Sequence, residues 1–216
     1  MINWKPIKPP FARFKKKVFI RAAQVSGIVY QIGEYPALRQ LSGKTPISRI
    51  KSEDVKAKIA YLKECLLRYR KITGYGRGIA GVQVGIRQRI AVVYSPHKLI
   101  TIINPKITKK SEKLLLYPEV CMSANPVIAP TIRPSWIEFE YYDENGRKQY
   151  WDKKDDTNKG KMMNRIFQHE IDHMDGIINI DKVKSPRDLI LESDPAFYKK
   201  AKFEEVEDRG KGEVSS

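Results

Sequence analysis

The chain has 216 residues, of which 41% are hydrophobic, and it carries a formal net charge of +16. This length favours one domain with extensions, and the apolar fraction is enough for one core. No run of about eighteen apolar residues is present, so we expect no membrane span. The chain has only 2 cysteines, which argues against a secreted disulfide scaffold.

The N-terminal residues 1–33 are basic and contain no acidic side chain. Aromatic residues and prolines lie among the basic residues, which are Lys5, Lys8, Arg13, Lys15, Lys16, Lys17 and Arg21. Such a segment suits contact with an RNA backbone, so we interpret residues 1–27 as a basic arm. The alternatives are a solvated segment and an organelle targeting segment. If the segment is a targeting segment, we expect the protein in the mitochondrion or another organelle matrix. If it is not, we expect the protein in the cytoplasm.

Helix and strand signals follow in chain order between residues 52 and 151. A helix is predicted over 52–70, because Ser52 is a suitable N-cap and acidic residues occupy the first turn. Cys65 falls on the apolar stripe of this helix and is expected in the core. Strands are predicted over 89–95, 99–104 and 113–117. A hairpin is predicted from 136–142 and 147–151, with Asn145-Gly146 in its turn.

The last third of the chain contains a second predicted helix, over residues 160–174, after an exposed charged loop over 152–161. Residues 186–216 mix proline, lysine and glutamate, and we expect a tail there with a short helix over 196–203. Strands that precede and surround a late helix suit the α+β class. We therefore predict three parts, which are the arm (1–27), a central domain (28–185) and the tail (186–216).

The most informative motif is Gln168-His169-Glu170-Ile171-Asp172-His173, which contains two of the 3 histidines. Residues four apart lie on one face of a helix, so both imidazoles can bind one metal ion. Glu170 is then close enough to handle a proton of a water at that ion. An ordinary salt-bridged helix surface is the alternative, but the apolar spacing before the motif favours a buried helix. The motif therefore predicts a metal-dependent hydrolase.

A catalytic site of this kind needs a third protein ligand and one open position for water. A histidine six residues beyond His173 is excluded, because Asn179 stands there. Glu192 is placed plausibly for a carboxylate ligand further downstream. Cys121 is the third candidate, and we favour it because it lies just before a proline-containing loop and not on an apolar stripe.

Three segments, in this order, resemble the motifs of the peptide deformylase family. They are Gly76-Arg77-Gly78-Ile79-Ala80-Gly81-Val82-Gln83, then Glu119-Val120-Cys121-Met122-Ser123, and then Gln168 to His173. The resemblance covers roughly residues 28 to 183, and three ordered motifs are far more specific than one glycine-rich loop. It implies an α+β fold in which antiparallel sheets surround the motif helix.

The resemblance also implies the roles of the site residues. Cys121, His169 and His173 would hold one divalent metal ion, with ferrous iron expected first and zinc, nickel or cobalt as alternatives. Glu170 would act as general base and acid. Gln83 and the backbone N–H of Met122 would stabilise the oxyanion, although Gln83 has a loop-fixing role as its alternative. The substrate would be the N-formyl group on the initiator methionine of a new polypeptide, released as formate. The basic arm would then face ribosomal RNA.

Residues around the motifs are candidates for substrate binding, namely Gly78, Ile79, Arg77, Met162, Arg165 and Ile166. Gly78 would let a substrate backbone pair with a sheet edge, and Met162 has helix core as its alternative. The sequence departs from the family pattern at Gly81, Val120 and Met122. A valine at 120, where glycine is usual, is expected to shift the backbone beside Cys121. Arg77 and Arg165 stand where the family has apolar pocket residues, so we expect them to narrow or charge the pocket.

The sequence leaves three functions to compare. An active deformylase is favoured, because the metal ligands, Glu170 and Gln83 are all retained. The alternative is a catalytically weakened, deformylase-like structural or binding protein attached to a ribosome, which the charge and the altered positions favour. The third function is a peptidase that uses Glu192 as a metal ligand.

Overall fold

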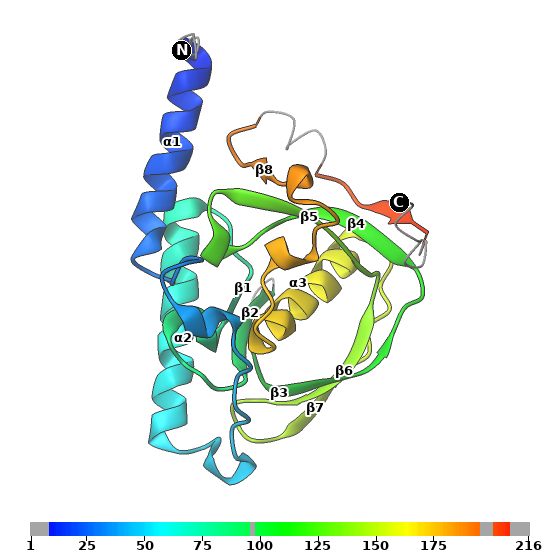
Figure 1. Cartoon of the computed structure of the whole chain (residues 1–216). Helices are drawn as coiled ribbons and strands as arrows, with labels where there is room; N and C mark the ends of the chain where they lie inside the picture. Colours follow the sequence, from blue (N-terminus) through cyan, green and yellow to red (C-terminus); the bar gives the residue numbers. More distant parts are fainter. Residues whose placement is uncertain (1–8, 96–97, 195–200, 208–216) are drawn as a thin grey trace.

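Helix α3 (Asn158–Met174) lies between two antiparallel β-sheets, and helix α2 (Glu53–Thr73) covers the outer face of one of them (Figure 1). The computed structural model describes residues 9–95, 98–194 and 201–207. This arrangement confirms the predicted α+β class with antiparallel sheets around the motif helix. Within the described ranges, no helix combines the length and apolar character that crossing a bilayer requires.

The first sheet has the strand order β1-β2-β3-β6-β7. Its strands are β1 (Gly78–Ala80), β2 (Ile90–Ser95), β3 (Lys98–Lys110), β6 (Ile137–Tyr142) and β7 (Lys148–Trp151). The predicted strand over 89–95 and the hairpin around Gly146 are confirmed, and this glycine has a φ of +72°. The strand predicted over 99–104 continues to Lys110, with register irregularities opposite β6.

The second sheet has the order β8-β5-β4-β9. Its strands are β4 (Leu114–Val120), β5 (Val127–Pro134), β8 (Ile190–Leu191) and β9 (Glu204–Val206). The sequence did not predict β5, because its prolines are typical of a loop. Pro130 lies opposite Pro118 of β4. Since neither has an N–H to donate, this pair belongs to the ladder positions that exchange no hydrogen bond.

Strand β2 of the five-stranded sheet is buried on both faces, and its neighbouring residues alternate between two cores. In β2, Ala91 and Val93 belong to the core around α3, whereas Ile90 and Val92 belong to the core under α2. The predicted N-cap of α2 is confirmed, because Ser52 Oγ accepts a hydrogen bond from Val55 N at 3.4 Å. The sheet therefore separates α3, which carries the motif, from α2 on its opposite face.

The segment predicted as a basic arm contains helix α1 (Pro9–Ser26), which the sequence did not predict. Val18 in the middle of the helix and Val25 near its C-terminal end are buried, and Val25 joins the core under α2. Arg21 forms an ion pair with Glu192, which follows β8. The N-terminal extension is therefore anchored to the domain through its last turns, while residues 1–8 lie outside the described part.

The segment predicted as a tail contributes strands to the second sheet. Strand β8 pairs with β5, and β9 pairs with the outer edge of β4. The short helix predicted over 196–203 falls mainly on residues 195–200, which lie outside the described part, and residues 201–203 are not helical. The described parts of both extensions therefore pack on the domain, while the predicted boundaries at 27 and 185 remain a prediction.

Candidate active site

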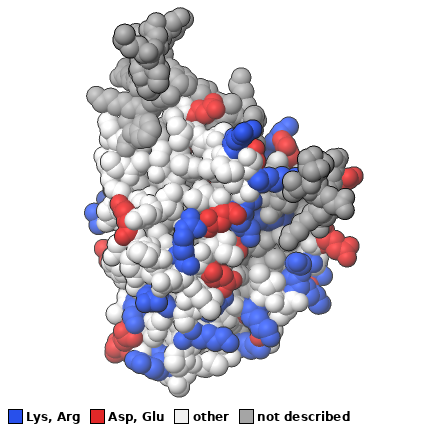
Figure 2. All heavy atoms as spheres, in the orientation of Figure 1, with Lys and Arg blue, Asp and Glu red and all other residues white. Residues whose placement is uncertain are grey.

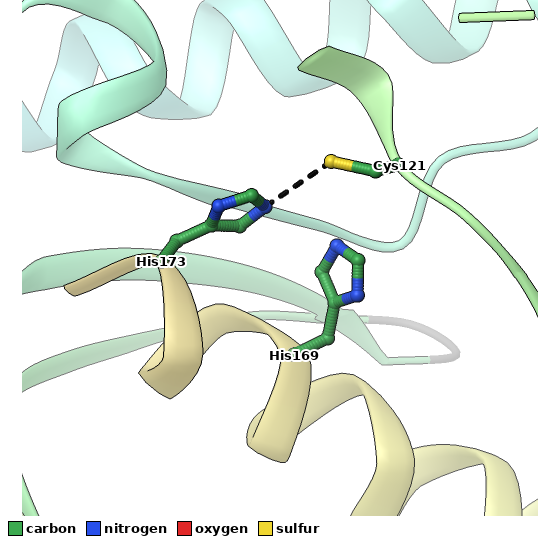
Figure 3. Close-up of side chains that lie close together, drawn as sticks. All are labelled: Cys121, His169 and His173. Carbon is green, nitrogen blue, oxygen red and sulfur yellow. Dashed lines mark hydrogen bonds between the residues drawn. The ribbon is translucent and has the colours of Figure 1, made fainter. Parts of the chain in front are cut away.

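Helix α3 presents the two motif histidines to Cys121 (Figure 3). The helix begins where Thr157 Oγ1 accepts a hydrogen bond from Gly160 N at 3.1 Å. The spacing of four residues brings His169 and His173 to one face, with ring centroids 4.8 Å apart. One donor atom from each of Cys121, His169 and His173 lies within 4.8 Å of the other two. The structure therefore brings the three predicted metal ligands together.

Cys121 lies between the end of β4 and a short 3-10 turn, Met122–Ala124. Its Sγ atom is 3.3 Å from His173 Nε2, and the residue is fully buried. The other cysteine, Cys65, lies in the core under α2, as predicted. A buried sulfur beside two imidazoles is a donor set that suits zinc, ferrous iron and similar divalent ions.

Glu192, the other candidate for the third ligand, and Asn179, which stands at the excluded histidine position, both have other partners. Glu192 forms an ion pair with Arg21 and accepts hydrogen bonds from Tyr75 Oη at 3.0 and 3.1 Å. Asn179 Nδ2 donates to the carbonyl oxygen of Glu119 at 3.1 Å. The hypothesis of a peptidase with Glu192 as metal ligand is therefore wrong for this structure.

Glu119 connects the cysteine strand to the motif helix through a buried network. Its carboxylate accepts two hydrogen bonds from Arg133 at 2.6 and 3.0 Å, and it lies 3.0 Å from His169 Nδ1. Burial alone would raise the pKa of Glu119, but Arg133, His169 and Arg165 outweigh burial and hold it well below its ordinary value. A carboxylate on Nδ1 orients the His169 ring so that Nε2 faces the site.

Sequence reasoning missed the role of Arg133, because strand β5 was not predicted. Arg133 is buried and also forms an ion pair with Asp172 at 2.5 Å. Asp172 is therefore linked to His169 by three successive contacts, through Arg133 and Glu119. The alternation of β5, with Thr131 and Arg133 buried, is the signal that could have located Arg133.

The Glu170 side chain lies against Gly78 of the edge strand β1 and lines the pocket. It is 3% exposed, and its Oε2 atom has no hydrogen-bond partner among the described residues. Burial raises the pKa of Glu170 to about 7. A Cβ atom on Gly78 would lie 2.2 Å from Glu170 Oε1, so only glycine leaves room for this carboxylate.

Gln83 and Met122 offer hydrogen-bond donors at the same site. Gln83 Oε1 accepts from Ala80 N at 2.9 Å, while its Nε2 atom lies 3.0 Å from Ser123 Oγ and 4.0 Å from Cys121 Sγ. Gln83 therefore fixes its own loop and also turns its amide nitrogen toward Cys121. Met122 is the first residue of a 3-10 turn, so its N–H has no partner within that turn.

A pocket of about 300 Å³ opens beside these groups. The predicted pocket residues Arg77, Gly78, Met162, Arg165 and Ile166 all line it. Ile79 does not line it, because its side chain is fully buried in the core under α2. The prediction for the Ile79 side chain is therefore wrong, since alternation in β1 turns it away from the site.

Val120 does not distort the cysteine strand. It ends β4 and pairs with Ile128 of β5 in the regular register. Among the described non-glycine residues only Asn104 has a positive φ, so valine is compatible with the backbone at 120. Valine is therefore accommodated at 120 without a strained φ, and the expected shift of the backbone relative to the family pattern remains a prediction.

A helix with His-Glu-x-x-His and a cysteine beside it define the site of a metal-dependent hydrolase. The family model for polypeptide deformylase matches residues 29–188. A peptide deformylase of Prochlorococcus marinus (strain NATL2A) is 37% identical over 169 residues, which are 74% of this chain and 75% of the relative. A second, of Rhizobium meliloti (strain 1021), is 31% identical over 162 residues, 72% of this chain and 85% of the relative.

The fold agrees with this match. The crystal structure of a peptide deformylase from Synechococcus elongatus in complex with actinonin has a TM-score of 0.62 and 28% identity to this chain. The match covers 80% of this chain and 84% of that chain. The chain belongs to the polypeptide deformylase family. The alternative of a weakened structural protein finds no support in these comparisons.

Proposed function

We propose that this chain hydrolyses the N-formyl group on the initiator methionine of new polypeptides and releases formate. The observation that carries the proposal is the cluster of Cys121, His169 and His173 with the Glu170 carboxylate beside it. Membership of the deformylase family gives the reaction class.

Cys121 as thiolate and the two neutral histidines would hold the metal ion. When bound, the ion would supply Lewis-acid polarisation and lower the pKa of a water molecule. Glu170 takes the proton of the attacking water and later gives it to the leaving amine nitrogen. Its raised pKa, about 7, suits both roles near neutral pH. The water oxygen joins the formyl carbon and the C–N bond breaks, so formate and a free amine result.

The Gln83 amide and the Met122 N–H stabilise the negative charge that develops on the formyl oxygen. The Gln83 amide is oriented by two hydrogen bonds, since Oε1 accepts from Ala80 N and Nε2 donates one hydrogen to Ser123 Oγ, which leaves the second Nε2 hydrogen for the formyl oxygen. Both donors are fixed before substrate arrives, one by its loop and the other by the turn after Cys121. Donors held in this way stabilise an oxyanion without reorganisation.

Strand β1 provides an edge for the peptide backbone of the substrate. It pairs with β2 on one side, and Tyr94 N donates to Arg77 O at 2.6 Å. Backbone groups alternate in direction along a strand, so the N–H and C=O of Gly78 point away from β2. A substrate strand can pair there, while its methionine side chain enters the apolar part of the pocket beside Met162 and Ile166.

Ferrous iron is the ion we propose first, with zinc, nickel and cobalt as alternatives. One sulfur and two imidazole nitrogens bind all four ions. Elemental analysis of protein purified without oxygen, from cells grown in unsupplemented medium, tests this assignment. Iron at about one equivalent per chain supports it, and a predominance of zinc under those conditions contradicts it.

We further propose that the basic N-terminal segment contacts ribosomal RNA. The net charge of +16 and the absence of acidic residues over 1–33 support this. Charges of both signs are interspersed on the face in Figure 2. No single basic patch on that face therefore stands out as an alternative RNA-binding surface to the N-terminal segment. We also propose a location in an organelle matrix, and in the mitochondrion in particular. The same basic N-terminal segment supports this proposal, because it suits an organelle targeting segment.

The deformylase activity is tested with a formyl-Met-Ala-Ser peptide and its acetylated counterpart. We expect protein loaded with ferrous iron under anaerobic conditions to release formate from the first and to leave the second nearly unchanged. Protein that binds one metal per chain but releases no formate would contradict the proposed function.

A further inference from the structure

Arg165 places a buried guanidinium group at the wall of the substrate pocket. It lies one helical turn before His169 and is 4% exposed. Its neighbours in the pocket wall are Tyr117, Met162 and Ile166. A charged side chain is rarely buried in such surroundings unless its hydrogen-bonding groups are used.

The protein satisfies part of this guanidinium. Arg165 Nη1 donates to Glu119 Oε1 at 2.6 Å and to Thr131 Oγ1 at 2.8 Å, and Nη2 donates to the carbonyl oxygen of Leu115. A guanidinium has five N–H groups. Among the described residues we find no acceptor for the Nε–H or for the second Nη2–H. These two donors belong to a side chain that lines the pocket.

The position of the guanidinium is fixed by two aromatic rings. Its central carbon lies 5.6 Å from the ring centre of Tyr117 and 5.8 Å from that of Phe203. The two rings pack on each other at 4.6 Å. Phe203 comes directly before β9, so the C-terminal segment helps to hold Arg165 in place. Arg165 cannot turn away from the pocket without breaking these contacts and its bonds to Glu119 and Thr131.

We propose that Arg165 makes this pocket selective for a first residue whose side chain ends in a hydrogen-bond acceptor, with methionine sulfoxide as the natural example. This inference rests on the proposed function. A purely apolar substrate side chain would displace water from the remaining N–H donors of Arg165 and would offer them no hydrogen-bond acceptor in its place. The thioether of methionine is a weak acceptor, whereas the oxygen of its sulfoxide is polar and accepts strongly. The enzyme would therefore deformylate chains whose initiator methionine has been oxidised.

Three tripeptides of similar size test the proposal: formyl-Met-Ala-Ser, its sulfoxide, and formyl-norleucine-Ala-Ser, which has no acceptor. We measure kcat/KM for each with the wild-type protein, Arg165→Met and Arg165→Lys. The ratio of sulfoxide to norleucine is expected to fall roughly tenfold or more in Arg165→Met, because a site built to donate a hydrogen bond rejects analogues that lack the acceptor. Arg165→Lys keeps a donor and is expected to retain most of the ratio. An unchanged ratio in Arg165→Met overturns the proposal.

Binding of the deformylated products to the wild-type protein gives a second readout that needs no variant to fold and no turnover. We expect Met-sulfoxide-Ala-Ser to bind more tightly than norleucine-Ala-Ser, and the reverse order overturns the proposal. Failure of the proposed function looks different. In that case the metal-loaded wild-type protein releases formate from none of the three peptides, and the order of product binding still decides the role of Arg165.

Discussion

At the scale of single residues, the site depends on a small residue that leaves space as well as on the residues that react. Gly78 leaves the space that the Glu170 carboxylate occupies. Replacing Gly78 with alanine would place a carbon 2.2 Å from Glu170 Oε1 and push the carboxylate aside. Because a displacement of about 1 Å can cost roughly a hundredfold in rate, we expect formate release to fall by about that factor.

The metal content of Gly78→Ala should remain that of the wild type, since Cys121 and the histidines are untouched. The matched control is Gly27→Ala, where an added Cβ meets no atom within 4 Å. Steady-state kinetics with formyl-Met-Ala-Ser and elemental analysis measure both effects. Equal rates for Gly78→Ala and Gly27→Ala would show that Glu170 does not need this space.

The two cysteines allow a paired test of the metal site. Cys121→Ala removes the only sulfur in the cluster, whereas Cys65→Ala changes a core residue under α2. We expect Cys121→Ala to lose most of its bound metal on dialysis, and Cys65→Ala to keep about one ion per chain. Metal retained by Cys121→Ala at the wild-type level would remove this residue from the ligand set.

Much of the site could be predicted at this scale, because its chemistry lies in short motifs. The spacing of His169 and His173 places them on one face of a helix, and Cys121 was favoured by its position outside an apolar stripe and then by the resemblance. Contacts between distant segments could not be predicted. Arg165 was expected only to narrow or charge the pocket, but it also binds Glu119, 46 residues earlier in the chain. The prediction of Ile79 as a pocket residue was wrong, because the direction of its side chain depends on how β1 pairs with β2.

At the scale of elements, Asn164 joins the motif helix to the β6–β7 hairpin. Its Oδ1 atom accepts from Ile137 N at 3.2 Å and from Trp151 Nε1 at 3.0 Å. Its Nδ2 atom donates to Lys153 O at 2.9 Å. Asn164→Ala leaves several buried polar groups unpaired, so we expect the free energy of unfolding to fall by roughly 2–4 kcal/mol.

Urea denaturation followed by tryptophan fluorescence measures this loss for Asn164→Ala. Asn158→Ala, at the exposed start of α3, is the matched control and should change stability by less than about 0.5 kcal/mol. A loss in Asn164→Ala no larger than that of the control would mean that the hairpin and helix are held by apolar packing alone.

Elements with local signals were predicted well, and elements that exist through tertiary pairing were not. The N-cap of α2 and the Asn-Gly turn of the hairpin are properties of a few neighbouring residues. Strand β5 contains prolines and is a strand because β4 pairs with it along its length. Strands β8 and β9 are short and depend on the sheet edges they join. Helix α1 has a highly basic sequence, and Val18 and Val25 are buried in its second half.

At the scale of the whole molecule, the excess of positive charge predicts salt-dependent binding to ribosomes. Replacing Lys15, Lys16 and Lys17 with glutamate should weaken co-sedimentation with ribosomes, and the wild-type protein should dissociate as salt rises from about 50 to 300 mM. The control reverses Lys106, Lys109 and Lys110, which are exposed on β3. Equal losses in both triple variants would indicate attraction by net charge and not contact by the N-terminal segment.

We expect one metal site, with Glu170 as its proton carrier, to remove the formyl groups. The most direct measurement is formate release by wild-type protein and by Glu170→Ala, both loaded anaerobically with ferrous iron and matched for metal content. We expect release by the wild type and a loss of at least about a thousandfold in the variant, with one ion bound to each protein. Release at similar rates by both proteins, at equal metal content, would contradict the account.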